Sequence, residues 1–111
     1  MSKQTTKGFE EQFIPCTGKK IGTFLFIHGF GGSYHDNFSA VMLARHFDYY
    51  AINLPGHGDT DIPCFDSGLE GYADYVVSYI RERGLRNLVL AGHSLGGAVV
   101  SVAEGKARDC L

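Results

Sequence analysis

Short runs of apolar residues, separated by turns rich in glycine and proline, predict several buried strands. The clearest run covers residues 21–28, Ile-Gly-Thr-Phe-Leu-Phe-Ile-His, and is continuous rather than alternating. A continuous run is typical of a strand that is covered on both faces of a sheet, so we expect a central strand here. Similar runs predict strands at 49–54 and 88–91. Residues 9–15 alternate loosely and end in proline, which is the pattern of an edge strand.

Helical spacing of apolar residues predicts helices between these strands. Asp36 can cap a first helix with Met42 in its core-facing stripe, which comprises Phe38, Val41, Met42, Ala44 and Phe47. A second helix is expected over 69–83, where Gly84 ends it, with an apolar stripe of Tyr72, Val76, Tyr79 and Ile80. Strands joined through helices favour parallel pairing with right-handed crossovers. The pattern therefore predicts an α/β fold with a mostly parallel sheet and helices on both faces.

The length of 111 residues indicates a single domain or a piece of a larger one. Hydrophobic residues make up 44% of the chain and charged residues 20%, which is an ordinary globular composition. We expect a core over residues 9–106, a flexible N-terminus over 1–8 and a short polar tail over 107–111. No repeat or interdomain linker interrupts the chain.

Charge and cysteine usage exclude several classes of function. A formal net charge of −2 and a pI near 6.2 give no sign of the basic surface that binds nucleic acid. The basic groups at 19–20 and 81–86 are expected on the solvated surface. The three cysteines have neither metal-ligand nor disulfide-framework spacing, which favours a reducing compartment. No signal peptide or membrane-spanning run is present, and the aspartates of the 59–69 segment lack the periodicity of a cation site. We expect a cytoplasmic protein without cofactor, metal or membrane span.

Residues 87–101, Asn-Leu-Val-Leu-Ala-Gly-His-Ser-Leu-Gly-Gly-Ala-Val-Val-Ser, organise the rest of the chain. They predict a strand, a sharp turn at Ser94, and a helix that begins at Leu95 and runs to Lys106. Gly92 and Gly96 lack the Cβ that would collide at such a turn, and Gly97 is expected to let the helix lie close to the strands. The helix N-terminus favours negative charge beside the serine. We interpret Ser94 as a nucleophile, against the alternative of a glycine-rich turn with an idle serine.

A second glycine-rich turn, Gly29-Phe30-Gly31-Gly32-Ser33, follows the strand at 21–28. Both turns open at the carboxyl edge of the expected sheet, where ligands bind, so they can share one site. The backbone N–H groups of Phe30 and Leu95 would then form an oxyanion hole beside Ser94. The alternative, a phosphate cradle, is disfavoured because the turn lacks both glycine-rich nucleotide-binding patterns.

These residues resemble the α/β-hydrolase superfamily, in particular its serine esterases and lipases. Three ordered motifs carry the resemblance over residues 21–106: His28-Gly29-Phe30-Gly31-Gly32, Leu54-Pro55-Gly56-His57-Gly58, and Gly92-His93-Ser94-Leu95-Gly96-Gly97. The resemblance implies that Ser94 is the nucleophile, that the N–H groups of Phe30 and Leu95 stabilise the oxyanion, and that the other residues of the first and third motifs support them. It also implies a small acyl or ester substrate and an N-terminal portion of the fold. Asp59-Thr60 departs from the family pattern after the second motif.

The family order of nucleophile, acid and histidine is incomplete in this sequence, because residues 95–111 hold no histidine. The five histidines lie in turn motifs or near the first helix, and Glu104 and Asp109 lie on or beyond the last helix, pointing away. We therefore expect low activity from this chain alone and favour a truncated hydrolase. The alternative is a non-catalytic module that self-associates, or pairs with a C-terminal half, through a bare sheet edge at 88–91. Relatives with the same turns also perform lyase, thioesterase or carbon–carbon hydrolase reactions.

Overall fold

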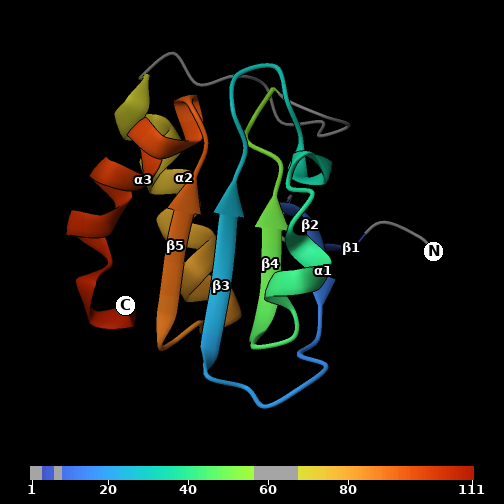
Figure 1. Cartoon of the computed structure of the whole chain (residues 1–111). Coiled ribbons are helices and arrows are strands. Elements are labelled where there is room, and N and C mark those ends of the chain that lie inside the picture. Colours follow the sequence, from blue (N-terminus) through green and yellow to red (C-terminus); the bar gives the residue numbers. More distant parts are fainter. Residues whose placement is uncertain (1–3, 7–8, 57–67) are drawn as a thin grey trace.

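The computed structural model describes residues 4–6, 9–56 and 68–111, whose strands and helices follow one another in the order of an α/β fold (Figure 1). The strands are β1 (Gln4–Thr6), β2 (Phe9–Ile14), β3 (Gly22–Ile27), β4 (Phe47–Ile52) and β5 (Leu88–Gly92). The helices are α1 (Ala40–Leu43), α2 (Leu69–Arg83) and α3 (Leu95–Lys106), with short 3₁₀ helices at Tyr34–Asp36 and Arg108–Cys110. The predicted strands and the predicted helices at 69–83 and 95–106 are confirmed.

The strands form one mixed sheet in the order β1-β2-β4-β3-β5. β3 lies between β4 and β5 and is parallel to both, which confirms it as a central strand. β2 pairs antiparallel with β4 on one side and with β1 on the other, so the expectation of an edge strand at 9–15 was wrong. Pro15 follows the last residue of β2, where its missing N–H does not interrupt the pairing.

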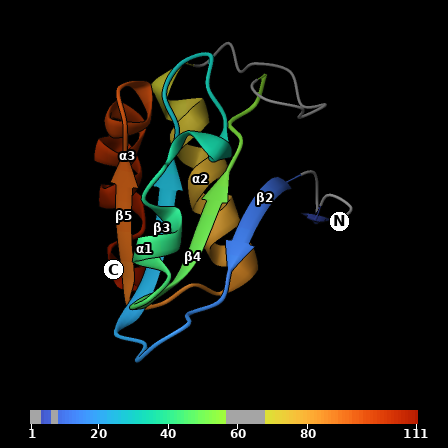
Figure 2. The ribbon, with the colours of Figure 1, turned by 45° about the vertical axis from the view of Figure 1, so that its right-hand side comes forward.

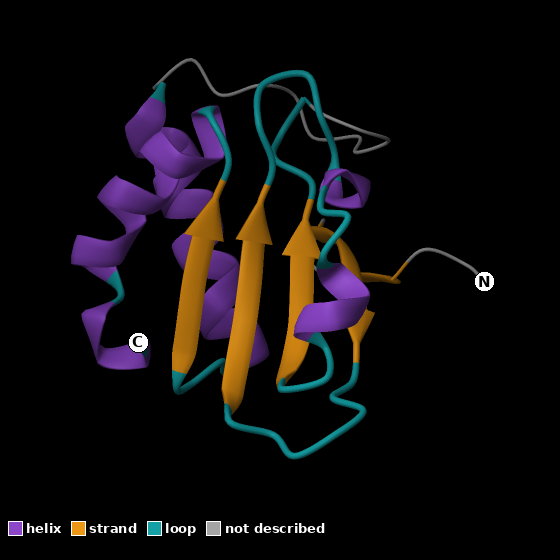
Figure 3. Ribbon diagram, in the orientation of Figure 1, coloured by secondary structure: helices purple, strands orange, loops and turns teal. Residues whose placement is uncertain are grey.

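Helices cover both faces of the sheet, as predicted (Figures 1 and 2). α2 and α3 pack on one face over Leu25, Ile27 and Ile52, and together they form the larger core cluster. α1 lies on the other face, where a smaller cluster contains Phe26, Ala40, Ala44, Tyr49 and Ala51. The carboxyl ends of β3, β4 and β5 lie at one edge of the sheet, because β3 is parallel to both of its neighbours (Figure 3).

The expected first helix differs most from the structure. Asp36 ends a 3₁₀ helix and its carboxylate accepts from the Ser33 N–H in a capping box, whereas Phe47 belongs to β4. α1 spans four residues, and Phe38 and Met42 are 97% and 60% exposed, so Met42 is not in the core. Of the predicted stripe, Ala44 is buried as expected, but Phe38, Val41 and Met42 are exposed, because the helix is too short to present a stripe. Ala40, outside the predicted stripe, joins Ala44 in the contact with the sheet.

Two groups expected on the surface are part of the packed structure. In the expected polar tail, Ala107 and Cys110 are fully buried against the larger core cluster. Within the basic group at 81–86, the Arg83 side chain is only 18% exposed and pairs with Glu11 of β2. Arg83 also lies over the ring of Tyr79, 5.3 Å from its centroid. Arg83 therefore links α2 to β2, and is not a solvated surface group.

In the described ranges, no helix is long and apolar enough to cross a membrane. The predictions for His57-Gly58, for the departure at 59–60 and for the loop at 59–67 fall outside the described residues. The adjoining turn at Pro55-Gly56 is described, and Gly56 has the positive φ of 77° that such a turn uses.

Candidate active site

Ser94 occupies a sharp reversal between β5, which ends at Gly92, and α3, which begins at Leu95. Its backbone has φ 57° and ψ −117°, a sparsely populated conformation for a residue with a Cβ. Ser94 is exposed, so its side chain stands at the carboxyl edge of the sheet and not in the core. A serine held in this conformation costs folding free energy, which the packing around the turn must offset.

The turn is possible because two glycines allow backbone segments to touch. A Cβ on Gly92 would lie 2.2 Å from the carbonyl oxygen of Gly96, and a Cβ on Gly96 would lie 2.0 Å from that of Ile27. These contacts confirm the sequence-based reason for both glycines. Gly97 differs, because a Cβ there would first meet the Gly92 oxygen at 3.6 Å, an ordinary contact. The expectation that Gly97 is needed for close helix packing was wrong.

The glycine-rich turn after β3 lies directly against Ser94. A Cβ on Gly29 would stand 3.2 Å from the Ser94 Cβ and 3.2 Å from the His93 carbonyl oxygen. Gly31 has a positive φ of 76°, and the Gly32 N–H donates to the Gly29 carbonyl at 3.0 Å. The structure thus brings together the two glycine-rich turns that the sequence placed at one edge.

The N-terminus of α3 begins beside the same point. The N–H of Leu95, the first helical residue, has no acceptor within the helix. The next N–H groups, of Gly96 and Gly97, donate to His93 and Ser94 carbonyls at 2.9 Å each. Phe30 is 82% exposed, so the glycine-rich turn leaves its ring at the surface beside this site.

His28 is buried and holds backbone in place. Its Nε2 accepts from the Leu54 N–H at 2.9 Å, so the ring proton lies on Nδ1, which donates to the Gly29 carbonyl at 2.6 Å. With both ring nitrogens engaged, His28 is a structural imidazole, as the sequence indicated. His93 is exposed, and its backbone N–H donates to the Ile27 carbonyl at 3.1 Å, which joins the turn to β3.

A buried polar group behind the glycine-rich turn was missed from the sequence. Asn53, 2% exposed, accepts from the Tyr34 N–H at 2.7 Å and donates through Nδ2 to the carboxylate of Glu10, which is also 2% exposed. Asn53 stands between two apolar residues at a strand end, which is a signal that could have identified it. Glu10 carries no such signal, because a glutamate in a loosely alternating strand is usually solvated.

The acidic residues near α3 lie away from Ser94. Asp109 follows the far end of α3 and pairs with Arg81 at 3.0 Å. The hydrogen bond from Arg81 lowers the pKa of Asp109 to about 2. This carboxylate is therefore a surface ion-pair partner, in agreement with the sequence interpretation.

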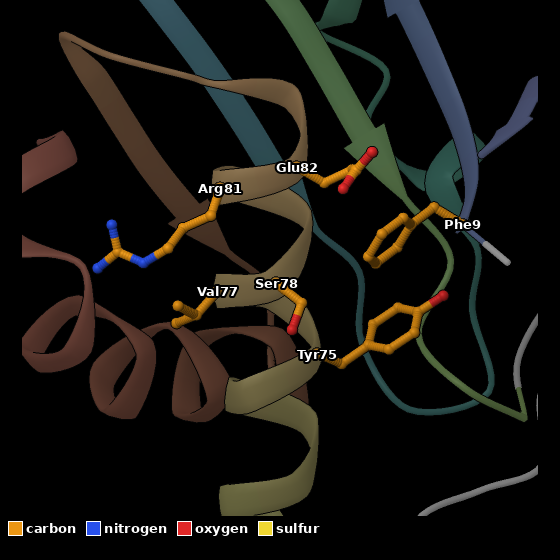
Figure 4. Close-up of a pocket in the computed structure, with 6 residues that line it drawn as sticks. All are labelled: Phe9, Tyr75, Val77, Ser78, Arg81 and Glu82. Atoms are coloured by element: carbon orange, nitrogen blue, oxygen red, sulfur yellow. The ribbon is translucent and has the colours of Figure 1, made fainter. Parts of the chain in front are cut away.

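A surface hollow lies beside α2 (Figure 4), lined by Phe9, Tyr75, Val77, Ser78, Arg81 and Glu82. The rings of Phe9 and Tyr75 contact one another with centroids 5.0 Å apart, whereas Val77 and Arg81 point to the other side of the helix. Neither Ser94 nor the glycine-rich turns contribute to this hollow, so it is separate from the candidate site.

Comparison with known proteins relates the chain to hydrolases. The "Alpha/beta hydrolase family" matches residues 24–109. Two curated relatives come from Mycoplasma pneumoniae. "Putative esterase/lipase 2" is 30% identical over 98% of this chain and 42% of its own length, and "Putative esterase/lipase 3" is 40% identical over 82% of this chain and 34% of its own length. The chain thus spans about two fifths or less of these relatives.

Solved structures show the same fold. E-2-(acetamidomethylene)succinate hydrolase superposes with a TM-score of 0.79 at 26% identity, over 93% of this chain and 37% of that protein. A marine microorganism esterase superposes with a TM-score of 0.77 at 23% identity, over 92% of this chain and 38% of that protein. With the family match extending over most of the sequence, the chain belongs to the alpha/beta hydrolase family.

Proposed function

We propose that this chain carries the nucleophile and the oxyanion-binding groups of a serine-type carboxylic ester hydrolase. Ser94 is the nucleophile, and the backbone N–H groups of Phe30 and Leu95 stabilise the oxyanion. The observation that supports this assignment best is the strained backbone of Ser94, with φ 57° and ψ −117°, packed against Gly29. Strain retained at an exposed polar residue, at the ligand-binding edge of a sheet, indicates a functional constraint.

In a completed site, a histidine accepts the Ser94 hydroxyl proton while Oγ attacks the carbonyl carbon of an ester. The carbonyl oxygen becomes an oxyanion, which the N–H groups of Phe30 and Leu95 stabilise. Collapse of this intermediate expels the alcohol, which takes the proton back from the histidine. Water then attacks the acyl-serine, and the histidine serves again as base and acid, releasing the carboxylic acid.

The base of this mechanism has no candidate among the described histidines near Ser94. Both ring nitrogens of His28 bond backbone groups. His93 directly precedes Ser94 in the chain, and consecutive side chains diverge at such a turn. We therefore propose low activity for this chain alone. Oxyanion stabilisation and binding without a full triad leave a residual acceleration of about 10³ to 10⁴ over water.

The proposed substrate is a small acyl compound or ester, in keeping with relatives whose names describe an esterase/lipase or a hydrolase. Lyase, thioesterase and carbon–carbon hydrolase reactions use the same two turns and remain alternative reactions for this site. No cofactor is required by the mechanism. The three cysteines lack disulfide-framework spacing, which supports the reducing cytoplasm as the proposed location.

Labelling with a fluorophosphonate probe tests the assignment of Ser94. The probe should modify the chain slowly, at Ser94 only, and the Ser94→Ala variant should not react. Adding the part of the Mycoplasma pneumoniae "Putative esterase/lipase 2" outside the matched 42% should speed the labelling. Rapid labelling of the isolated chain at Ser94 would show that it holds a base of its own, and modification at another residue would refute the assignment.

The second candidate function is that of a non-catalytic module that pairs through β5. Among the described strands β5 pairs with β3 alone, and Val89 on this strand is 44% exposed, so the edge can accept a further strand (Figure 3). The same edge supports self-association. Stable binding of a complementing chain without esterase activity would favour this function. A chain that sediments as a monodisperse monomer, alone and in the presence of the complementing chain, would argue against it.

A further inference from the structure

Asn53 connects the end of β4 to the segment that follows the glycine-rich turn. Its Oδ1 accepts from the backbone N–H of Tyr34 at 2.7 Å, and its Nδ2 donates to Glu10 Oε1. We infer that Asn53, oriented by Glu10, is a positioning residue for the glycine-rich turn at Gly29–Ser33. This inference rests on the proposed function, because it matters for catalysis only if that turn supplies an oxyanion-binding N–H.

The chemistry of the three groups allows one orientation of the Asn53 amide. The carboxylate of Glu10 accepts hydrogen bonds, and the backbone N–H of Tyr34 can only donate one. Asn53 must therefore present its NH₂ to Glu10 and its carbonyl to Tyr34. Both side chains are 2% exposed, so water cannot readily replace either partner.

A second connection fixes the other end of the same turn. The residue after Asn53, Leu54, donates its N–H to His28 Nε2, and His28 Nδ1 donates to the Gly29 carbonyl. Consecutive residues beyond β4 thus hold both ends of the turn, at Gly29 and at Tyr34. The backbone carbonyl of Glu10 also accepts from the Asn53 N–H at 3.0 Å, which links Asn53 to β2. The backbone between these two anchors, which includes Phe30, is thereby held in place relative to Ser94.

Because the Asn53 amide can take only one orientation, positions 10 and 53 should be able to exchange their donor and acceptor groups. Asn53→Asp places two carboxylates together and loses the donor to Glu10, while Glu10→Gln removes the charge. The double variant Glu10→Gln/Asn53→Asp restores both side-chain hydrogen bonds of position 53, because the glutamine NH₂ donates to the aspartate and the aspartate accepts from Tyr34. A merely space-filling role for Asn53 would not show this rescue, because Asn53→Asp barely changes the side-chain volume.

Amide hydrogen exchange by NMR on the intact chain measures the connection directly. The exchange rate of the Tyr34 amide, relative to that of Leu25 in β3, should rise about tenfold or more in Asn53→Asp, because repulsion from the Glu10 carboxylate moves the aspartate oxygen away from the Tyr34 N–H and that hydrogen bond is lost. It should return to within about threefold of the wild-type ratio in the double variant. The matched control is Asn87→Asp, since Asn87 bonds the Ile21 carbonyl at the opposite end of the sheet and should leave this ratio unchanged.

An unchanged Tyr34 ratio in Asn53→Asp, or a double variant that stays as fast as the single one, would overturn the inference. If Asn53→Asp does not fold, the double variant decides, because a folded protein with a protected Tyr34 supports the inference and an unfolded or unprotected one overturns it. Fluorophosphonate labelling separates this result from the proposed function. Failure to label Ser94, with Tyr34 rescue intact, would remove the proposed function and leave the connection standing.

Discussion

Gly29 and Ser94 lie so close that a Cβ on the glycine would stand 3.2 Å from the Cβ of the serine. They come from turns that follow different strands, β3 and β5, which are neighbours in the sheet. This contact, between residues far apart in the sequence, makes one site of two glycine-rich turns. Because 3.2 Å is tight but not prohibitive, we expect Gly29→Ala to shift the turn by a few tenths of an ångström and to slow Ser94 labelling more than it lowers stability.

Gly96 and Gly97 provide a matched pair that tests the packing of the turn. Gly96→Ala puts a Cβ 2.0 Å from the Ile27 carbonyl oxygen, whereas Gly97→Ala meets its first atom at 3.6 Å. Urea unfolding should show a loss of about 3 kcal/mol or more for Gly96→Ala, from overpacking against backbone. Gly97→Ala should stabilise by up to about 1 kcal/mol, because alanine is the better helix residue. Equal effects of the two variants would contradict the described geometry.

The serine side chain at position 94 should lower the stability of the fold relative to glycine. Its positive φ favours glycine, so Ser94→Gly should raise the free energy of unfolding by about 1 kcal/mol while abolishing fluorophosphonate labelling. Ser101→Gly is the control, since Ser101 lies in the interior of α3 and donates to the Gly97 carbonyl at 3.1 Å. That variant should lower stability, and a Ser94→Gly protein that is less stable than wild type would show that the serine is unstrained.

The pair of Arg83 and Glu11 should matter far more than the pair of Arg81 and Asp109. Arg83 Nε donates to Glu11 Oε1 at 3.0 Å, and the two side chains are 18% and 6% exposed. Glu11→Ala leaves the mostly buried charge of Arg83 without its carboxylate partner, and should lower the free energy of unfolding, measured by chemical denaturation, by about 3 kcal/mol. Arg81→Ala removes a pair whose side chains are 46% and 60% exposed, and should change stability little. A similar loss of stability in both variants would be evidence that the Arg83–Glu11 pair is not more buried than the Arg81–Asp109 pair.

Alkaline pH should destabilise the fold through its tyrosines. Burial, followed by the charge of Glu10, raises the pKa of Tyr75 to about 12, and burial also raises the pKa of Tyr79. A phenol with a raised pKa in the folded state contributes stability that is complete below its unfolded pKa of about 10 and is lost as the pH rises toward 12. The loss from Tyr75 is of order 2 kcal/mol. Denaturation monitored between pH 9 and about pH 12 should show this decline, reduced in Tyr75→Phe. Tyrosinate absorbance that appears near pH 10 in the folded protein and is lost in Tyr75→Phe would refute the raised pKa of Tyr75.

Local patterns in the sequence predicted the elements that carry the site. The continuous run before His28 gave a central strand, and Gly84, with φ 64°, ends α2 as a glycine past a helix should. The spacing around Ser94 gave the strand, the turn and the helix at nearly their observed bounds. These features depend on neighbours in the chain, which is why the sequence alone was sufficient.

Features that depend on long-range pairing were not predictable in the same way. Phe38 and Met42 follow helical spacing, but only the position of α1 over β4 decides that they face outward. The pairing of β2 with β1, and the burial of Cys110, depend on segments packing from elsewhere in the chain. Asn53 and Glu10 form a bond across 43 positions, and no local pattern connects them.

Esterase activity in a complementation assay measures directly whether Ser94 acts as the nucleophile. The chain, or its Ser94→Ala variant, is mixed with the part of the Mycoplasma pneumoniae "Putative esterase/lipase 2" outside the matched 42%, and hydrolysis of a small chromogenic ester is followed. We predict that the wild-type mixture hydrolyses the ester much faster than either component, and that the Ser94→Ala mixture does not. A stable complex in which both mixtures are equally active, or equally inactive, would contradict the account.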